Sequence, residues 1–415
     1  MTTDRLESLM RFHPFTRLNK LLESVQAGGG NTPLALSVGE PQFTPPQMVQ
    51  RLIAEQFPLW GKYPQALGNE PFRKAVAGWL TRRFRLPEGM VDPARHVMSV
   101  SGTREGLFHI ALSAVPEVGP GDEKPVVLMP NPFYHVYAGA AAAAGAEPYF
   151  LNATVENGFM PDIAAIPAAI LKRTALAYVC SPANPQGAVA PLSYLCDWLK
   201  LARAHDFVLA SDECYSEIYR GTPPHGALEA ARELGGALDN LVVFHSLSKR
   251  SSGAGLRSGF VAGEARLIQR QAQLINFGGV ATPFPILAAA TELWQDEAHV
   301  QDYRAKYIEN FNAAQDALED IFGEVRAEGG FFLWLDVGDG EAAAKALWEQ
   351  AAIKVLPGGY MARADASGFN PGQRYIRVAL VLEPAEMSAA LKRMAPVLAR
   401  VVEQHGGAQQ RAKMV

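Results

Sequence analysis

The sequence has few cysteines and no excess of charge of one sign. Its 415 residues include only Cys180, Cys196 and Cys214, without the paired spacing of a zinc site or a disulfide framework. We therefore expect no metal site and a reducing compartment. Lysine and arginine total 38 against 42 acidic residues, and the net charge of −4 excludes the basic surface that nucleic acid or an anionic membrane attracts. The expected partners are small molecules.

Targeting and membrane segments are also missing. Charged residues interrupt the stretch from Met1 to Phe15, which leaves no uncharged core of signal-peptide length. The alanine-rich run Ala138–Ala146 is much shorter than the roughly 20 apolar residues of a membrane span, and Glu147 follows it. We expect a buried helix there and a cytoplasmic protein.

The composition is that of a packed globular protein. Apolar residues make up 48% and charged residues 19% of the chain, as in ordinary folded domains. A length of 415 residues exceeds the size at which a single hydrophobic core stops growing, so it predicts two domains. Gly28-Gly29-Gly30-Asn31 indicates a flexible joint after an opening helix, which we interpret as an N-terminal arm.

Short apolar runs alternate with longer helical patterns from about Val97 onward. This alternation predicts an α/β fold in which helices cover both faces of a mostly parallel sheet. Because ligands of such sheets bind outside the carboxyl ends of the strands, the polar turns after these runs are expected to converge on one site. The runs are Val126–Met129, Ala175–Val179, Phe207–Ser211, Leu241–His245 and Gly259–Ala262.

The pattern changes after about Ala288. We expect a long amphipathic helix carrying Trp294, then the apolar run Phe331–Val337, another helix and the run Tyr375–Val381. This order predicts a smaller α+β domain. The expected division is an arm with part of the small domain at 1–45, a large domain at 46–290 and the C-terminal small domain at 291–415.

Polar motifs follow these strands in a specific order. Ser246-x-Ser248-Lys249 alone is a weak signal, since most lysines after a strand are solvated surface charges. The motifs that accompany it, in chain order, are Gly39-Glu40-Pro41, Tyr63-Pro64, Gly102-Thr103, Asn184-Pro185, Asp212-Glu213-x-Tyr215, Gly255-Leu256-Arg257-x-Gly259 and Arg377-Val378. With this series the sequence resembles the fold-type I aminotransferases of class I and II, which depend on pyridoxal 5'-phosphate (PLP).

The resemblance implies roles for the residues around the reactive atoms. Lys249 would hold PLP through a Schiff base and carry the substrate proton, for which a lysine amine is suited. Asp212 would lie beside the ring nitrogen, where a carboxylate favours the protonated ring that withdraws electrons. Asn184 and Tyr215 would donate hydrogen bonds to the phenolic oxygen of the cofactor.

A second group is implied for the phosphate. Gly102, Thr103 and Arg104 open a helix whose N-terminus attracts an anion. Ser246 and Arg257 would complete the phosphate cup.

The resemblance also assigns two tyrosines. Tyr134 would stack on the cofactor ring, with Phe133 or Tyr137 as alternatives for that role. Tyr63 resembles the tyrosine that reaches the phosphate of the neighbouring subunit, which implies a homodimer with shared active sites.

Substrate recognition is expected at Arg377. An arginine in the apolar run Tyr375–Val381 requires a partner, and the resemblance implies a bidentate pair with the substrate α-carboxylate. A structural salt bridge is the alternative. Gly39, through its backbone N–H, and Asn184 would bind the same substrate.

Interpretations from other classes are less consistent with the residues. Gly253-Ala254-Gly255 after a strand is typical of nucleotide-dependent oxidoreductases, but Ser258 replaces the third glycine and no crossover helix follows. Regulators built on the PLP fold usually carry a DNA-binding module, for which this chain has no spare length or basic surface. A PLP β-lyase or a cyclising enzyme on the same fold stays open.

Four segments carry a closer resemblance, to the succinyldiaminopimelate aminotransferases of bacterial lysine biosynthesis. It implies amino transfer between N-succinyl-L,L-diaminopimelate and 2-oxoglutarate or glutamate, with Arg11, Arg17 and Lys20 of the arm as candidate cations for the distal carboxylates. Gly253-Ala254 and Gln273–Pro283 depart from the pattern, so a general aspartate, alanine or aromatic aminotransferase is the alternative. The four segments are Phe133–Gly139, Ser211–Tyr219, Phe244–Ser251 and Asn370–Gly372.

Overall fold

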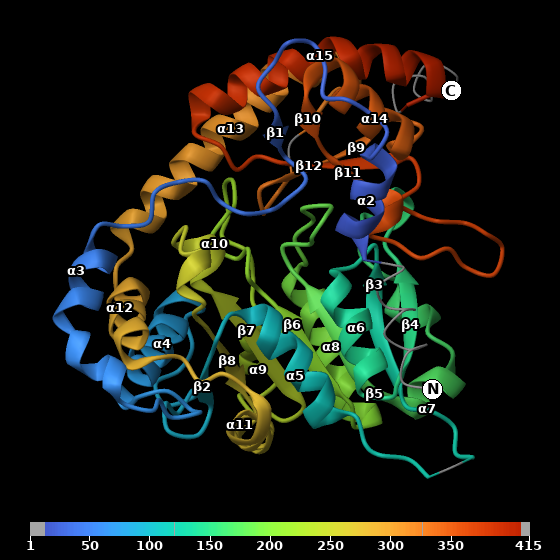
Figure 1. The fold of residues 1–415 in the computed structure, drawn as a ribbon. Helices are drawn as coiled ribbons and strands as arrows, with labels where there is room; N and C mark the ends of the chain where they lie inside the picture. The colour runs from blue at the N-terminus through green and yellow to red at the C-terminus, as the bar shows by residue number, and fades with distance from the viewer. Residues whose placement is uncertain (1–12, 120, 326, 408–415) are drawn as a thin grey trace.

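A seven-stranded sheet forms the centre of the larger part of the computed structural model, which describes residues 13–119, 121–325 and 327–407. The strand order is β2-β8-β7-β6-β5-β3-β4 (Figure 1). Neighbours from β7 to β4 run parallel, whereas β8 is antiparallel to both of its neighbours. The predicted mostly parallel α/β sheet is confirmed. The strands are β2 (Val97–Val100), β3 (Val126–Asn131), β4 (Glu147–Asn152), β5 (Thr174–Cys180), β6 (Val208–Asp212), β7 (Leu241–Ser246) and β8 (Gly259–Gly263).

Both faces of this sheet are buried. Successive residues of a strand point to opposite faces, so a strand covered on both sides must be apolar throughout. In β7, Leu241 and Val243 pack in one core while Val242 and Phe244 pack in the other. This arrangement explains the unbroken apolar runs of the sequence.

Helices supply the two covering layers. In α6 (His135–Ala143), Ala140 and Ala141 are fully buried, as expected for the alanine-rich run. The other helices of the larger part are α3 (Met48–Glu55), η1 (Phe57–Gly61), α4 (Glu70–Arg83), α5 (Thr103–Ala114), η2 (Val155–Asn157), η3 (Ile163–Ala165), α7 (Ala168–Arg173), α8 (Leu192–His205), α9 (Ala227–Glu233), α10 (Leu247–Arg250), η4 (Ala254–Leu256), α11 (Ala265–Gly278) and α12 (Phe284–Gln295).

The smaller part contains an antiparallel sheet of order β11-β12-β9 and a parallel pair of β1 with β10. The β1–β10 pair ties a segment near the N-terminus to the C-terminal third of the chain, and Figure 1 shows α2 at the boundary between the two parts. These elements are α2 (Pro14–Leu22), β1 (Leu34–Ala35), α13 (Ala298–Phe322), β9 (Phe332–Asp336), α14 (Gly340–Ala351), β10 (Ile353–Lys354), β11 (Leu356–Pro357), η5 (Gly358–Tyr360), β12 (Tyr375–Ala379) and α15 (Pro384–His405).

The long helix expected to carry Trp294 is in fact two helices, so that prediction was wrong. Asp296 separates them, and its Oδ2 accepts a hydrogen bond from the backbone N–H of His299 at 3.1 Å near the start of α13. Leu293 and Trp294 pack beside the large sheet, while α13 runs up to α15 in the smaller part (Figure 1). The boundary expected at residue 290 falls inside α12, and we keep the division into 1–45, 46–290 and 291–415 as a proposal.

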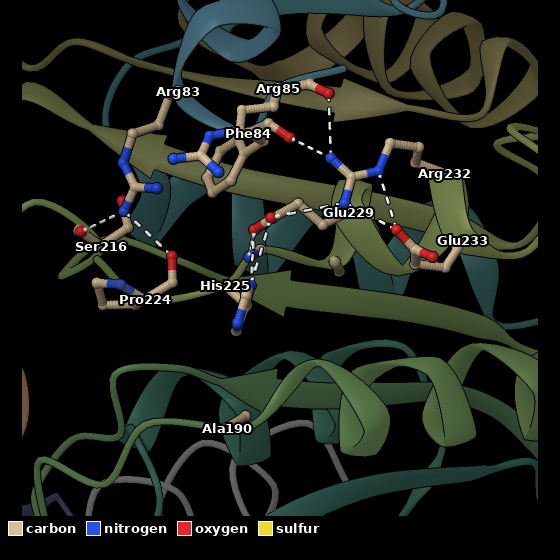
Figure 2. Close-up of polar contacts among 12 residues, drawn as sticks. Arg83, Phe84, Arg85, Ala190, Ser216, Pro224, His225, Glu229, Arg232 and Glu233 are labelled. Atoms are coloured by element: carbon tan, nitrogen blue, oxygen red, sulfur yellow. Dashed lines mark hydrogen bonds and ion pairs between the residues drawn. The ribbon is translucent and has the colours of Figure 1, made fainter. Parts of the chain in front are cut away.

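Arginines at the end of α4 and on α9 fasten loops around the large sheet (Figure 2). Arg83 Nη2 donates to the carbonyl oxygens of Ser216 at 3.0 Å and Pro224 at 3.1 Å, so it holds the segment that follows β6. Arg232 Nη1 donates to the carbonyl oxygen of Phe84 at 3.0 Å.

Among the residues described, no helix is long and apolar enough to cross a membrane.

Candidate active site

The carboxyl ends of three neighbouring strands open into one cleft between the two parts. β6 ends at Asp212, β7 ends at Ser246, and Asn184 lies in the turn after β5. Ser246 Oγ accepts the backbone N–H of Ser248 at 3.1 Å and so caps α10, which carries Lys249. The cleft encloses about 780 Å³ of empty space.

Lys249 is a partly buried amine that lines the cleft. Its Nζ donates to the backbone carbonyl oxygen of Gly39, a neutral partner, rather than to a carboxylate. Burial lowers the pKa of Lys249 to about 8. The neutral, nucleophilic form of the amine is therefore accessible near neutral pH.

Asp212 is a buried carboxylate on the same side of the cleft. Tyr137 donates its hydroxyl proton to Asp212 Oδ2 at 2.6 Å, and the backbone N–H of Cys214 lies 3.3 Å from Oδ1. Burial raises the pKa of Asp212, while the hydrogen bonds from Cys214 and Tyr137 work in the opposite direction. A cation placed beside this carboxylate would favour its ionised form.

Tyr137 and Tyr134, two of the three candidate stacking residues, lie in different positions relative to the cleft. Tyr137 is fully buried and its ring stacks on that of Tyr178, with centroids 4.4 Å apart, so it lies behind Asp212. Tyr134 lines the cleft, where its hydroxyl accepts a hydrogen bond from Arg104 Nε at 2.9 Å. The geometry favours Tyr134 over Tyr137 for contact with a ligand.

A cup at the start of α5 adjoins the cleft. Gly102 has φ of +90°, a backbone conformation that favours glycine, and a Cβ on it would lie 2.2 Å from Arg257 Nη2 and displace that guanidinium. Arg257 Nη2 donates to the carbonyl oxygen of Ser101 at 3.1 Å. Thr103, Ser246 and Arg257 line one hollow of about 1050 Å³ together with Lys249. The predicted phosphate residues are thus brought together.

Arg377 enters the cleft from β12 of the smaller part. Its Nη1 donates to Asn184 Oδ1 at 2.9 Å and its Nη2 to the carbonyl oxygen of Ser37 at 2.6 Å. Its buried Nε has no hydrogen-bond partner among the described residues, and burial lowers the pKa of Arg377 to about 10. Since none of its partners in the described chain is a carboxylate, the structure does not support the structural salt bridge that the sequence left open.

Gly39 and Tyr215 complete the wall near Arg377. A Cβ on Gly39 would lie 2.6 Å from the Phe332 ring, which explains why glycine stands there. Tyr215 lines the cleft, and burial raises the pKa of its hydroxyl well above the ordinary value, so it stays a hydrogen-bond donor.

Comparison with known proteins identifies the group to which this site belongs. Residues 31–394 match the family of aminotransferases of class I and II. The chain belongs to this family. An LL-diaminopimelate aminotransferase from Moorella thermoacetica is 32% identical over 404 residues, covering 93% of this chain and 96% of that protein.

Two solved structures extend the comparison. An aminotransferase from Neisseria meningitidis is 37% identical with a TM-score of 0.86, over 95% of this chain and 97% of that one. A probable N-succinyldiaminopimelate aminotransferase from Thermus thermophilus has a TM-score of 0.75 over 95% and 100% of the two chains. At 23% identity the latter supports the fold alone.

Aminotransferases of this family depend on PLP, and the cleft fits that cofactor. A partly buried amine without an acidic partner suits its aldehyde, and the carboxylate of Asp212 suits a protonated ring nitrogen. The glycine turn and helix N-terminus at Gly102 suit a phosphate. When bound, PLP supplies the electron sink that weakens the bonds to the substrate Cα.

Other expected residues of the aminotransferase lie outside the cleft. Tyr63 is 100% exposed in the single chain and contacts no part of the site. On the arm, Arg17 stacks on the Tyr360 ring at 3.8 Å, Lys20 is exposed, and Arg11 lies outside the described residues. Neither Arg17 nor Lys20 lines the cleft.

Sequence reasoning missed several residues of the site. His135, directly after Tyr134, lines the cleft together with Pro14 and Phe15 of α2. Tyr137 was considered only for stacking, although its spacing of three from Tyr134 on one helix turn was a usable signal. The partners that brace α10 were also missed, because they come from the distant junction between α12 and α13.

Proposed function

We propose that this aminotransferase moves an amino group between a diaminopimelate-type amino acid and 2-oxoglutarate, with N-succinyl-L,L-diaminopimelate as the first candidate donor. The observation that carries amino transfer is the placement of Lys249, Asp212 and Arg377 around one cleft. The donor class is supported by the sequence resemblance and by the name of the Moorella relative, which makes free LL-diaminopimelate the second candidate.

Lys249 is proposed as anchor and proton carrier. Its lowered pKa leaves a neutral Nζ that can accept the proton of the substrate Cα. The same amine would then return this proton to a carbon of the cofactor. Asp212 is proposed to hold positive charge on the ring nitrogen, and Tyr137 keeps its carboxylate oriented through the 2.6 Å hydrogen bond.

Arg377 is proposed to bind the substrate α-carboxylate. Its unpartnered Nε and planar guanidinium offer the geometry that a carboxylate needs, in a position with little competing water. Asn184 Oδ1 is already occupied by Arg377, so its amide N–H groups are left to donate, with Tyr215, to the phenolic oxygen of the cofactor. The Gly39 N–H is proposed to assist at the carboxylate.

The cup is proposed to hold the phosphate through Gly102, Thr103, Arg104, Ser246 and Arg257. Tyr134 is proposed to cover the ring. Tyr63 is proposed to act in the site of a second subunit, which would make the enzyme a homodimer with shared sites.

The test pairs purified holoenzyme with 2-oxoglutarate and a panel of amino donors, and follows glutamate formation. We expect kcat/KM for N-succinyl-L,L-diaminopimelate to exceed that for aspartate or alanine by about two orders of magnitude, or roughly 3 kcal/mol of differential binding. Lys249→Ala should abolish the reaction and leave no cofactor fixed to the protein by borohydride.

Each other outcome has a defined meaning. A preference for free LL-diaminopimelate would replace the first candidate by the second. Equal rates with aspartate or an aromatic amino acid would indicate a general aminotransferase. Release of ammonia and pyruvate without glutamate would indicate a β-lyase.

A further inference from the structure

The mouth of the cleft carries a pair of imidazoles that the proposed reaction leaves unused. His135 begins α6 and lines the cleft, while His13 immediately precedes α2. Their ring centroids lie 4.9 Å apart at an angle of 71°, and Phe15 meets His135 edge to face at 6.5 Å. The arm therefore reaches the rim of the cleft through histidine and aromatic contacts rather than through Arg17 or Lys20.

The groups that face His135 are predominantly basic. They are His13 from the start of α2, Arg104 from α5 and Arg377 from β12, together with the neutral Tyr134 ring at 4.8 Å. Burial, followed by the charges of His13, Arg104 and Arg377, lowers the pKa of His135 to about 3. Burial and Arg104 also lower the pKa of His13.

Arg104 is an exposed cation at the same rim. Its Nε donates to the neutral hydroxyl of Tyr134 at 2.9 Å, which leaves the guanidinium charge without a carboxylate among its contacts in the described chain. Since Arg377 is assigned to the α-carboxylate and Arg104 to the phosphate, the imidazoles of His135 and His13 are the N–H donors at the rim that the proposed reaction leaves unused.

We propose that His135 and His13 form a recognition site for the distal anionic group of the amino donor, so that the enzyme prefers substrates carrying a second carboxylate beyond the α-carbon. This inference rests on the proposed aminotransferase cleft and on Arg377 binding the α-carboxylate. It names a substrate class, the long dicarboxylic amino acids, and does not depend on whether the amino donor is succinylated.

Coupling between proton uptake and carboxylate binding gives this site a measurable pH dependence. A carboxylate beside His135 favours the protonated imidazole, so the bound complex has a higher His135 pKa than the free enzyme. Binding of a distal carboxylate then takes up a proton, and its affinity rises as the pH falls toward the pKa of the complex. A ligand that lacks the distal carboxylate gains nothing from this change.

The probes are pimelate and heptanoate, unreactive acids of equal chain length that differ in one carboxylate. Their dissociation constants are measured on the PLP-loaded enzyme by the change in cofactor absorbance and by calorimetry. The ratio of the heptanoate constant to the pimelate constant, each expressed for the fully ionised acid, should rise as the pH falls from about 8 to about 6, because only the pimelate complex takes up a proton.

Substitutions separate recognition from packing. His135→Gln retains donor capacity but cannot be protonated, so it should keep heptanoate binding and cofactor absorbance while the ratio becomes independent of pH. His13→Gln removes one of the charges that lower the pKa of His135, so the pH effect should persist and move to higher pH. His109→Gln replaces another partly buried histidine, on α5 and not among the residues that line the cleft, and should leave both constants unchanged.

Three results would overturn the inference: equal affinity for the two probes in the wild type, equal loss of both in His135→Gln, or an unchanged pH effect in that variant. Failure of the proposed function looks different. If pimelate binding follows the expected pattern while diaminopimelate donors are not turned over, the donor assignment is wrong and the rim site stands.

Discussion

Burial sets the chemistry of the individual charged residues in the cleft. It lowers the pKa of Lys249 to about 8 and that of Arg377 to about 10, and it raises the pKa of Asp212. In each case the charged form has lost water without gaining a full counter-charge from the chain. A charged ligand group would supply the counter-charge that each of these side chains lacks. This explains why polar residues occupy the otherwise apolar junction between the two parts of the molecule.

Arg377→Lys tests this idea at a single residue. A lysine retains the positive charge but loses the planar fork and the bonds to Asn184 and Ser37. We expect KM for amino and oxo acids to rise about ten- to a hundredfold, the range of one or two charge-assisted hydrogen bonds, while the cofactor spectrum stays unchanged. Steady-state kinetics and absorbance spectra provide the measurement.

Arg374→Lys is the matched control. Arg374 lies just outside β12, pairs with Asp336 at 3.0 Å and contacts no part of the cleft, so its replacement should leave KM as it was. If Arg377→Lys instead lost PLP and kept its substrate affinity, the assignment of Arg377 to the α-carboxylate would be wrong.

Among the elements, α10 depends most on its neighbours, because it contains Lys249 and is only four residues long. A helix of that length is unstable by itself. Arg250 Nη2 pairs with Glu297 at 2.7 Å, and Ser251 Oγ shares a hydrogen bond of 2.8 Å with His299 Nε2, while His299 Nδ1 contacts Asp296. The junction of α12 and α13 thus holds α10 in place.

His299→Ala should loosen α10. Loss of its hydrogen bonds leaves Ser251 and Asp296 partly unsatisfied, for which we expect a loss of about 1–3 kcal/mol in unfolding free energy. Because Lys249 then lacks a fixed backbone, kcat should fall more than KM changes. Denaturant unfolding and steady-state kinetics measure both effects.

His225→Ala serves as the comparison for that variant. His225 also contacts a carboxylate, Glu229, at 3.3 Å, but it is far more exposed and belongs to the loop before α9. Both stability and kcat should change little. A His299→Ala enzyme with wild-type kcat would show that the junction stabilises the fold without positioning Lys249.

For the whole molecule, two exposed aromatic side chains and a hollow beside the cup bear on the proposed homodimer. Tyr63 is 100% exposed and Phe277 is 94% exposed, and a hollow of about 1300 Å³ next to Arg257 is lined by Phe108, Val280 and other apolar side chains. Apolar patches of this kind are typical of interfaces. The proposed homodimer would cover them and bring Tyr63 to the neighbouring phosphate cup.

Mixed dimers test this arrangement. A dimer of one Tyr63→Phe chain and one Lys249→Ala chain contains one complete site only if each site takes Tyr63 from the other subunit. We expect isolated mixed dimers to show about half of the wild-type activity, because one of their two sites is complete, whereas the Tyr63→Phe homodimer loses about 1.5–3 kcal/mol of phosphate contact, measured as weaker PLP binding. Mixed dimers no better than half the Tyr63→Phe homodimer would place Tyr63 in its own subunit's site.

The sequence by itself determined the features that depend on neighbours along the chain. Alternation of apolar runs and helices predicted the parallel sheet, and the strand ends placed Asp212, Ser246 and Lys249 correctly at one edge, because parallel strands end on the same side. The motif order was sufficient for the family and for PLP.

Only the tertiary structure decided which distant side chains meet. Arg377 reaches Asn184 and Ser37 across the junction of the two sheets, and His135 meets His13 because α2 docks at that junction. The break between α12 and α13 likewise depends on Trp294 packing against the large sheet. A one-dimensional pattern records which residues are apolar and at what spacing. The partners of a buried charge depend on how the two sheets and their helices pack, and no local periodicity encodes that.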